Sequence, residues 1–237
     1  MRGVNKIKRI WANISGKTKR KSNADWGLIF RKTTPISRVF GLDRGKPIDR
    51  YYIDSFLQKY TDDIRGYVME VGDNSYTRTF GSDKVINSDV LHVTSGNRKA
   101  TIVGNLATGE GIPQNRFDCM ILTQTLPFIY DVKTAIGNAY YALKPGGILL
   151  VTVSGLSQIS RYDMNRWGDF WRFTDASASR LFSDVFGADN ITVETYGNVL
   201  TACAFLQGLA TEELTISELD FIDPDYQMII TIRAIKN

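Results

Sequence analysis

The chain has 237 residues, of which 43% are hydrophobic, 23% charged and 11% aromatic. This length suits one sizeable α/β domain, and the composition is ordinary for a globular protein. No apolar run approaches the ~20 residues of a membrane-spanning helix, and no signal-peptide pattern follows the basic N-terminus. We therefore expect a cytoplasmic protein.

The net charge of +4 is unevenly distributed along the chain. Residues 1–22 carry eight Lys and Arg and no acidic residue, whereas the rest holds 21 basic and 25 acidic side chains, a net charge of −4. The body is thus mildly acidic and lacks the basic excess of a nucleic-acid enzyme, so nucleic acid is not an expected partner. With one His and no Cys cluster, no metal site is expected either.

The basic N-terminal segment has an amphipathic pattern. Its apolar residues fall at helical spacing, namely Ile7, Ile10, Trp11 and Ile14. Residues 4–22 could therefore lie on an anionic membrane surface, or dock on this protein or on a partner. We divide the chain into a basic arm, residues 1–33, and a single domain, residues 34–237.

Helix-like and strand-like stretches alternate through the domain. A helix is predicted from Ile48 to Tyr60, and Asp131 is expected to cap a second one, which the Lys-Pro-Gly-Gly sequence at 144–147 ends. Two more helices are predicted at 175–186 and 198–210. Strands are predicted at 67–71, 85–93, 100–106, 117–124, 147–155, 191–196 and 227–235.

Apolar strands separated by helices predict an α/β fold with a mainly parallel sheet covered on both faces. Ligands on such a sheet bind beyond the carboxyl ends of the strands. The segments of interest are therefore 70–76, 89–96, 105–108 and 123–128.

These strand ends carry motifs of a known family. "VMEVGD" (68–73), "NRFDCMILTQTLPFIYD" (115–131) and "ALKPGGILLVTV" (142–153) resemble, in order and spacing, those of class I S-adenosylmethionine-dependent methyltransferases. "FGLDRGKPIDRYYI" (40–53) and "NRWGDFWRFT" (165–174) resemble a bacterial subfamily often encoded with, or fused to, glycosyltransferases. The resemblance implies a Rossmann-like class I fold with seven strands, the last antiparallel. It also implies S-adenosylmethionine as cofactor and S-adenosylhomocysteine as product.

The turn after the first strand departs from the family, because the further glycines of its motif are missing. Gly72 lets a ligand approach the backbone, and Asp73 and Asn74 can replace the glycines in the turn. Glu70 is a candidate partner for the cofactor's ammonium group. Its alternative role is to cap the next helix.

Other strand ends supply the remaining cofactor candidates. For the ribose hydroxyls these are Asp89, which lies early in its strand, and His92, whose alternative is a structural role. Asn105 stands where the family commonly has Asp and keeps an acceptor for the adenine amino group. The rest are Leu106 for the adenine ring, Gln124, Thr125 and Leu126 near the methyl donor, and Arg50 and Tyr52 over the methionine end, with core packing as the alternative for the tyrosine.

The segment 161–174 gathers aromatic and charged side chains suited to a polar ring such as a sugar, or to a packed loop. Its candidate substrate residues are Arg161, Tyr162, Arg166, Trp167, Trp171 and Arg172. A hydroxyl acceptor needs a base, for which Asp163 and Asp169 are the candidates.

The resulting hypothesis is O-methylation of a sugar, glycan or related small molecule in polysaccharide biosynthesis, with a glycosyltransferase as partner. The alternative is a non-catalytic methyltransferase-fold domain that serves binding or assembly. A nicotinamide-dependent dehydrogenase is disfavoured, because the chain lacks the Gly-x-Gly-x-x-Gly turn.

Overall fold

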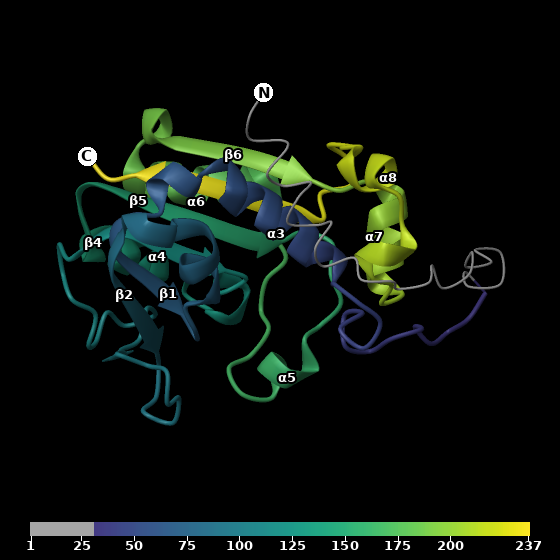
Figure 1. Ribbon diagram of the computed structural model, residues 1–237, viewed down its shortest axis with the longest axis horizontal. Coiled ribbons are helices and arrows are strands. Elements are labelled where there is room, and N and C mark those ends of the chain that lie inside the picture. The colour runs from purple at the N-terminus through teal and green to yellow at the C-terminus, as the bar shows by residue number, and fades with distance from the viewer. Residues whose placement is uncertain (1–30) are drawn as a thin grey trace.

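A computed structural model describes residues 31–237, so the amphipathic segment 4–22 lies outside the described residues. Within them, seven strands form one sheet in the order β3-β2-β1-β4-β5-β7-β6 (Figure 1). β7 runs antiparallel to both of its neighbours, and the other strand pairs are parallel. The strands are β1 (Gly66–Val71), β2 (Val85–His92), β3 (Ile102–Val103), β4 (Phe117–Thr123), β5 (Leu143–Ser154), β6 (Ile191–Tyr196) and β7 (Ile229–Ile235).

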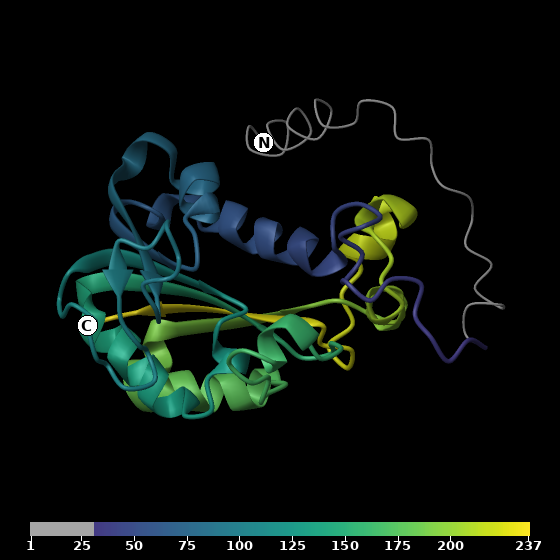
Figure 2. The same cartoon turned by 90° about the horizontal axis from the view of Figure 1, so that it is seen from below.

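Helices cover both faces of this sheet (Figure 2). One face is covered by α3 (Ile48–Lys59), and the other by α4 (Val132–Ala142) and α6 (Asp175–Phe186). α7 (Val199–Leu206) and α8 (Ile216–Asp220) pack at one end, and α5 (Arg161–Met164) lies on the long loop after β5 (Figure 1). The remaining turns are η1 (Thr61–Asp63), η2 (Thr77–Gly81), η3 (Ser82–Lys84), η4 (Leu126–Phe128), η5 (Ala188–Asn190) and η6 (Thr211–Glu213).

The apolar strand β4 shows why the sheet needs both layers. Met120 and Leu122 pack in the cluster of α4 and α6, whereas Cys119 and Ile121 pack in the cluster of α3. Because successive strand side chains point to opposite faces, a strand buried on both faces is apolar throughout. The predicted mainly parallel sheet with an antiparallel last strand is confirmed.

Helix capping follows the sequence closely. Asp131 accepts hydrogen bonds from the Thr134 backbone N–H (3.0 Å) and hydroxyl (2.7 Å), as expected of an N-cap. Thr174 and Ser177 form a capping box at the start of α6, whose predicted bounds are confirmed.

The predicted strand boundaries differ most from the structure at β5 and β3. The Lys-Pro-Gly-Gly sequence lies inside β5, because Gly146 takes a φ of +76° and its N–H bonds the Lys236 carbonyl at 2.7 Å. β3 spans only Ile102–Val103, because the chain turns at Asn105, whose N–H bonds the Glu110 carbonyl at 2.8 Å. In residues 31–237, no helix combines the length and apolarity required to cross a bilayer.

Candidate functional site

The carboxyl ends of β1, β2, β3 and β4 meet at one cavity of about 590 Å³, here called the strand-end cavity. Parallel strands bring these ends to the same edge of the sheet, where ligands of such folds bind. It is lined by residues 71–72, 91–93, 104–107, 123–125 and 128–130, and by Asp163, Arg166, Trp167 and Phe170 from the loop after β5.

The turn after β1 forms around Gly72. Its φ is +84°, and a Cβ added there would have no described atom within 4 Å, so the backbone borders open space. Asp73 Oδ1 accepts bonds from the Ser75 N–H (3.0 Å) and hydroxyl (2.6 Å), which closes the turn locally. Asn74 donates to the Ser88 hydroxyl at 2.9 Å. Asp73 and Asn74 thus make the turn without lining the cavity, which Gly72 does line.

Glu70 is turned away from the strand-end cavity, contrary to its proposed cofactor contact. Its side chain is buried and accepts bonds from the Tyr76 N–H (3.3 Å), the Thr77 N–H (2.9 Å) and the Thr77 hydroxyl (2.9 Å). Strand alternation places Glu70 on the face of Val68, which packs under α3 and η2. Burial raises the pKa of Glu70 to about 7. This geometry matches the other role considered for Glu70, in which its carboxyl group caps the turn that follows β1.

The two candidates for the ribose hydroxyls, both on β2, lie in different places. His92 lines the strand-end cavity, with its ring 5.8 Å from that of Trp167. Asp89 is buried in mid-strand, where it accepts bonds from Arg116 (3.0 Å) and from the Thr101 hydroxyl (2.8 Å). Asp89 lies three residues before the strand end and does not line the strand-end cavity, so the structure does not support its expected cofactor contact.

The β3 turn brings Asn105 and Leu106 to the strand-end cavity. Asn105 Oδ1 accepts the Ala107 N–H at 2.9 Å, which fixes the side chain and leaves one oxygen lone pair. The Leu106 side chain is buried, and its carbonyl accepts a bond from Asn138 at 2.7 Å.

The end of β4 is strained. Gln124 has a φ of +49°, a conformation costly for a residue with a side chain and frequent at functional sites. Its N–H bonds the Thr152 carbonyl at 2.9 Å, and the residue lines the strand-end cavity with Thr125. Leu126 is fully buried in the core cluster of α4 and α6, because η4 turns it inward. Its expected place at the cavity is wrong.

A second cavity of about 290 Å³, here called the adjoining cavity, lies beside the first. The two share Thr123, Gln124, Phe128 and Asp163, so they meet at the end of β4. It is lined further by Phe40, Leu42, Pro47, Asp49, Arg50, Pro127, Ser154, Ser157, Gln158, Ser160, Asp169, Arg172, Phe205 and Ile229.

Helix α3 contributes to the adjoining cavity through its first turn. Arg50 lines it and donates to the Tyr76 hydroxyl at 3.1 Å. Tyr52 does not, because it is 1% exposed and donates to the Leu219 carbonyl at 3.0 Å, so core packing replaces the expected cofactor contact.

Asp49, which precedes Arg50, was missed by sequence reasoning. Its buried Oδ1 accepts no hydrogen bond from the described residues, and burial raises the pKa of this carboxyl. An acidic residue in a first helical turn is common, so only the residue's place in the adjoining cavity distinguishes it.

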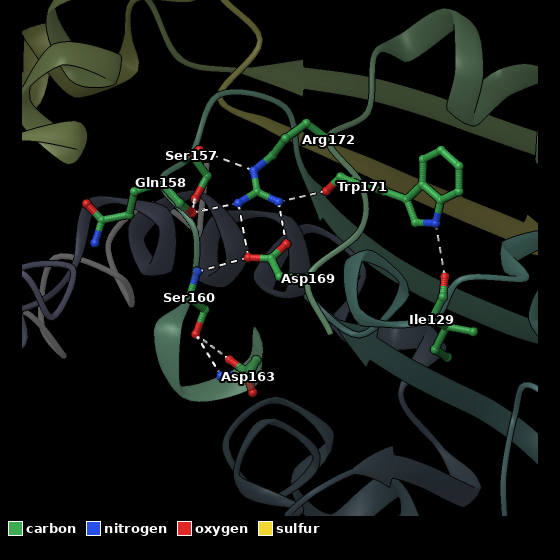
Figure 3. Close-up of polar contacts among 8 residues, drawn as sticks. All are labelled: Ile129, Ser157, Gln158, Ser160, Asp163, Asp169, Trp171 and Arg172. Carbon is green, nitrogen blue, oxygen red and sulfur yellow. Dashed lines mark hydrogen bonds and ion pairs between the residues drawn. The ribbon is translucent and has the colours of Figure 1, made fainter. Parts of the chain in front are cut away.

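The two catalytic candidates have different surroundings (Figure 3). Asp169 accepts bonds from the Ser160 N–H (2.9 Å) and from Arg172 (2.6 and 3.2 Å), and its side chain is 1% exposed. Arg172 also donates to the carbonyls of Ser157 (3.2 Å) and Gln158 (2.7 Å). We call this set the Asp169–Arg172 clasp. Asp163 accepts one hydroxyl bond, from Ser160 at 2.5 Å, and lines both cavities.

The other substrate candidates divide among three locations. Arg166 and Trp167 line the strand-end cavity, although they were expected on the acceptor side. Trp171 donates to the Ile129 and Tyr130 carbonyls, both at 3.2 Å, and so holds the loop against η4. Arg161 and Tyr162 are exposed outside both cavities. Residues 31–237 contain no group of three or more His, Cys, Asp or Glu side chains that could hold a metal ion.

Comparisons agree with this geometry. Residues 73–151 match the family model described as a methyltransferase domain. No curated protein sequence matches the chain.

Three solved structures share the fold at low sequence identity. A SAM-dependent methyltransferase of Archaeoglobus fulgidus is 10% identical with a TM-score of 0.52, over 79% of this chain and 94% of that one. A Mesorhizobium loti S-adenosylmethionine-dependent methyltransferase is 14% identical with a TM-score of 0.50, over 76% and 95%. Phosphoethanolamine N-methyltransferase 2 of Haemonchus contortus, solved with phosphomonomethylethanolamine and S-adenosylhomocysteine, is 12% identical with a TM-score of 0.53; the match spans 78% of this chain and about half (52%) of that protein. This chain therefore has the Rossmann-like class I methyltransferase fold, with a methyltransferase domain matched over residues 73–151.

Proposed function

We propose that this chain is an S-adenosylmethionine-dependent methyltransferase that methylates a hydroxyl of a sugar, glycan or related small molecule. The observation that carries the proposal is the meeting of two cavities at Gln124 and Asp163. One cavity is the strand-end cavity of a methyltransferase fold, and the other is lined by polar and aromatic side chains. A methyl donor and an acceptor need such contiguous sites, because the displacement is in-line.

The strand-end cavity fits the cofactor on observations of its own. Gly72 leaves room at the β1 turn, and the volume of about 590 Å³ is that of a small-molecule site. We assign the adenine end to Asn105 and Leu106, and a ribose hydroxyl to His92. Gln124 and Thr125 lie on the methyl-donor side. When bound, S-adenosylmethionine supplies a methyl group on a sulfonium leaving group.

In the adjoining cavity, Asp163 is the proposed base. It would take the proton of the acceptor hydroxyl as the O–methyl bond forms and the sulfonium–methyl bond breaks, with S-adenosylhomocysteine as the leaving group. Asp169 is a positioning residue, because Arg172 and Ser160 already occupy its oxygens. The Asp49 carboxyl, which lines the same cavity, is the proposed partner of another acceptor hydroxyl.

The wider setting is also part of the proposal. The resemblance of segments 40–53 and 165–174 supports membership of the glycosyltransferase-linked subfamily and a role in polysaccharide biosynthesis. We propose a cytoplasmic domain at 34–237 whose basic arm, residues 1–33, contacts the inner membrane face through residues 4–22.

Calorimetry tests the cofactor, and mass spectrometry tests the acceptor. We expect S-adenosylmethionine and S-adenosylhomocysteine to bind the purified chain, and a screen of sugars and glycosides with labelled cofactor to yield products heavier by one methyl group. Absence of binding at millimolar cofactor would overturn the enzyme proposal in favour of the non-catalytic alternative. Binding combined with N-methylated products alone would overturn the hydroxyl acceptor.

A further inference from the structure

A third concavity, here called the basic pocket, lies outside the two cavities already described. It is lined by residues 32–35 and Arg38, by Gln158, Ile159 and Arg161, and by residues 206–207, and has a volume of about 500 Å³. Lys32, Arg38 and Arg161 give it three cations, and its lining within residues 31–237 includes no carboxylate.

These three cations have no carboxylate partner in the part of the chain that the structure describes. Among residues 31–237, twelve ion pairs form elsewhere, but none of the three cations lies within 4.0 Å of a carboxylate. All three are exposed to solvent. Like charges that converge in a concave site raise the local positive potential, which attracts an anion. Two arginines suit a phosphate in particular, because each guanidinium can donate two parallel hydrogen bonds.

The basic pocket borders the adjoining cavity at Gln158. Gln158 lines both, and its amide donates to the Arg38 carbonyl at 3.4 Å. Arg161 directly follows Ser160, which lines the adjoining cavity and binds Asp163. The Asp169–Arg172 clasp fixes the Gln158 backbone between the two sites (Figure 3). The two sites are therefore neighbours on the loop after β5, a placement suited to two ends of one elongated ligand.

We infer that the basic pocket binds a phosphate group of the methyl acceptor, whose hydroxyl-bearing part occupies the adjoining cavity. The inference rests on the proposed function and narrows its substrate class to phosphorylated sugars or glycans. The phosphate can belong to a soluble molecule or to a lipid, and the two sources share the same recognition chemistry.

The first test is calorimetry on the full chain with S-adenosylhomocysteine present, titrated with glucose 1-phosphate and, separately, with glucose. The R38Q/R161Q double variant should lower the affinity for glucose 1-phosphate about tenfold or more, since each lost arginine removes charge-assisted bonds. R78Q is the matched control, because Arg78 is exposed and lines none of the three sites. The basic arm is present in every variant, so any contribution of the arm to the measured affinity is the same in each.

A second arm distinguishes the source of the phosphate. Flotation with phosphatidylcholine vesicles that contain phosphatidic acid measures binding to a lipid phosphate. If R38Q/R161Q loses only vesicle binding, the phosphate belongs to a lipid. If it loses glucose 1-phosphate binding, the phosphate belongs to a soluble molecule. If the double variant matches the wild type in both assays while S-adenosylhomocysteine still binds, the inference fails and the proposed function stands. If S-adenosylhomocysteine does not bind the wild type, the proposed function itself fails.

Discussion

The strand-end cavity and the adjoining cavity differ in how the chain builds them. The first is assembled mainly from short segments that directly follow parallel strands, with four further residues from the loop after β5. The second joins segments far apart in sequence, from Phe40 and α3 to the loop after β5, α7 and the start of β7. Hydrogen bonds of the sheet position the first, whereas the Asp169–Arg172 clasp and helix packing position the second. A binding site can thus be secured by backbone pairing or by side chains, and the latter is easier to break.

The largest expected effect lies where the two cavities meet. D163N should lower kcat by about 10²- to 10⁴-fold, the usual contribution of a general base, with the Kd for S-adenosylmethionine unchanged. Steady-state kinetics and calorimetry measure the two quantities. D83N, at an exposed residue of η3, is the control. A kcat equal to that of the wild type would show that Asp163 is not the general base.

Gly72 tests the strand-end cavity alone. G72V should weaken S-adenosylmethionine binding by more than about 100-fold, because a side chain at φ +84° is strained and would project into space the cofactor needs. Calorimetry gives the Kd. Gly137, in mid-helix with nothing within 4 Å of an added Cβ, is a contrasting site. G137A should raise the free energy of unfolding by about 0.5–1 kcal/mol with cofactor binding intact. If G72V binds S-adenosylmethionine as tightly as the wild type, the cofactor does not lie against the β1 turn.

The clasp tests the adjoining cavity. R172Q leaves Asp169 buried with the Ser160 N–H as its remaining partner, so the free energy of unfolding should fall by about 2–3 kcal/mol. Urea denaturation measures this loss, and limited proteolysis should show earlier cleavage within residues 155–174. R180Q removes an exposed pair with Asp184 and should cost less than about 0.5 kcal/mol. Equal stability of both variants would argue that side chains do not secure this cavity.

The effect of Glu70 is confined to the pH dependence of stability. Its pKa is raised from 4.5 to about 7, so the native state holds a proton that the unfolded state releases. The resulting stabilisation is present below pH 4.5 and is lost as pH rises through 7, on the order of 2–3 kcal/mol. E70Q should lack this decline, so the difference in the free energy of unfolding between wild type and E70Q should change from pH 4.5 to 8. Parallel curves would contradict a buried, protonated Glu70.

Sequence patterns determined the parts of this protein that local physics controls. Continuously apolar strands, the Asp131 cap and the glycine at the β1 turn each act within a few residues. The sheet and the strand-end positions of Gly72, His92, Asn105 and Gln124 followed from them. The resemblance added the antiparallel β7, which no local pattern specifies.

The tertiary structure alone decided where individual polar side chains point. Glu70 caps η2 because strand alternation puts it under that turn, and Asp89 is buried because Arg116 reaches it from another segment. Asp49 lines the adjoining cavity because segments distant in sequence pack around it. Asp169 forms its ion pair with Arg172 within the folded loop after β5. Sequence spacing fixes which face of an element a residue occupies, but its partner depends on what packs against that face.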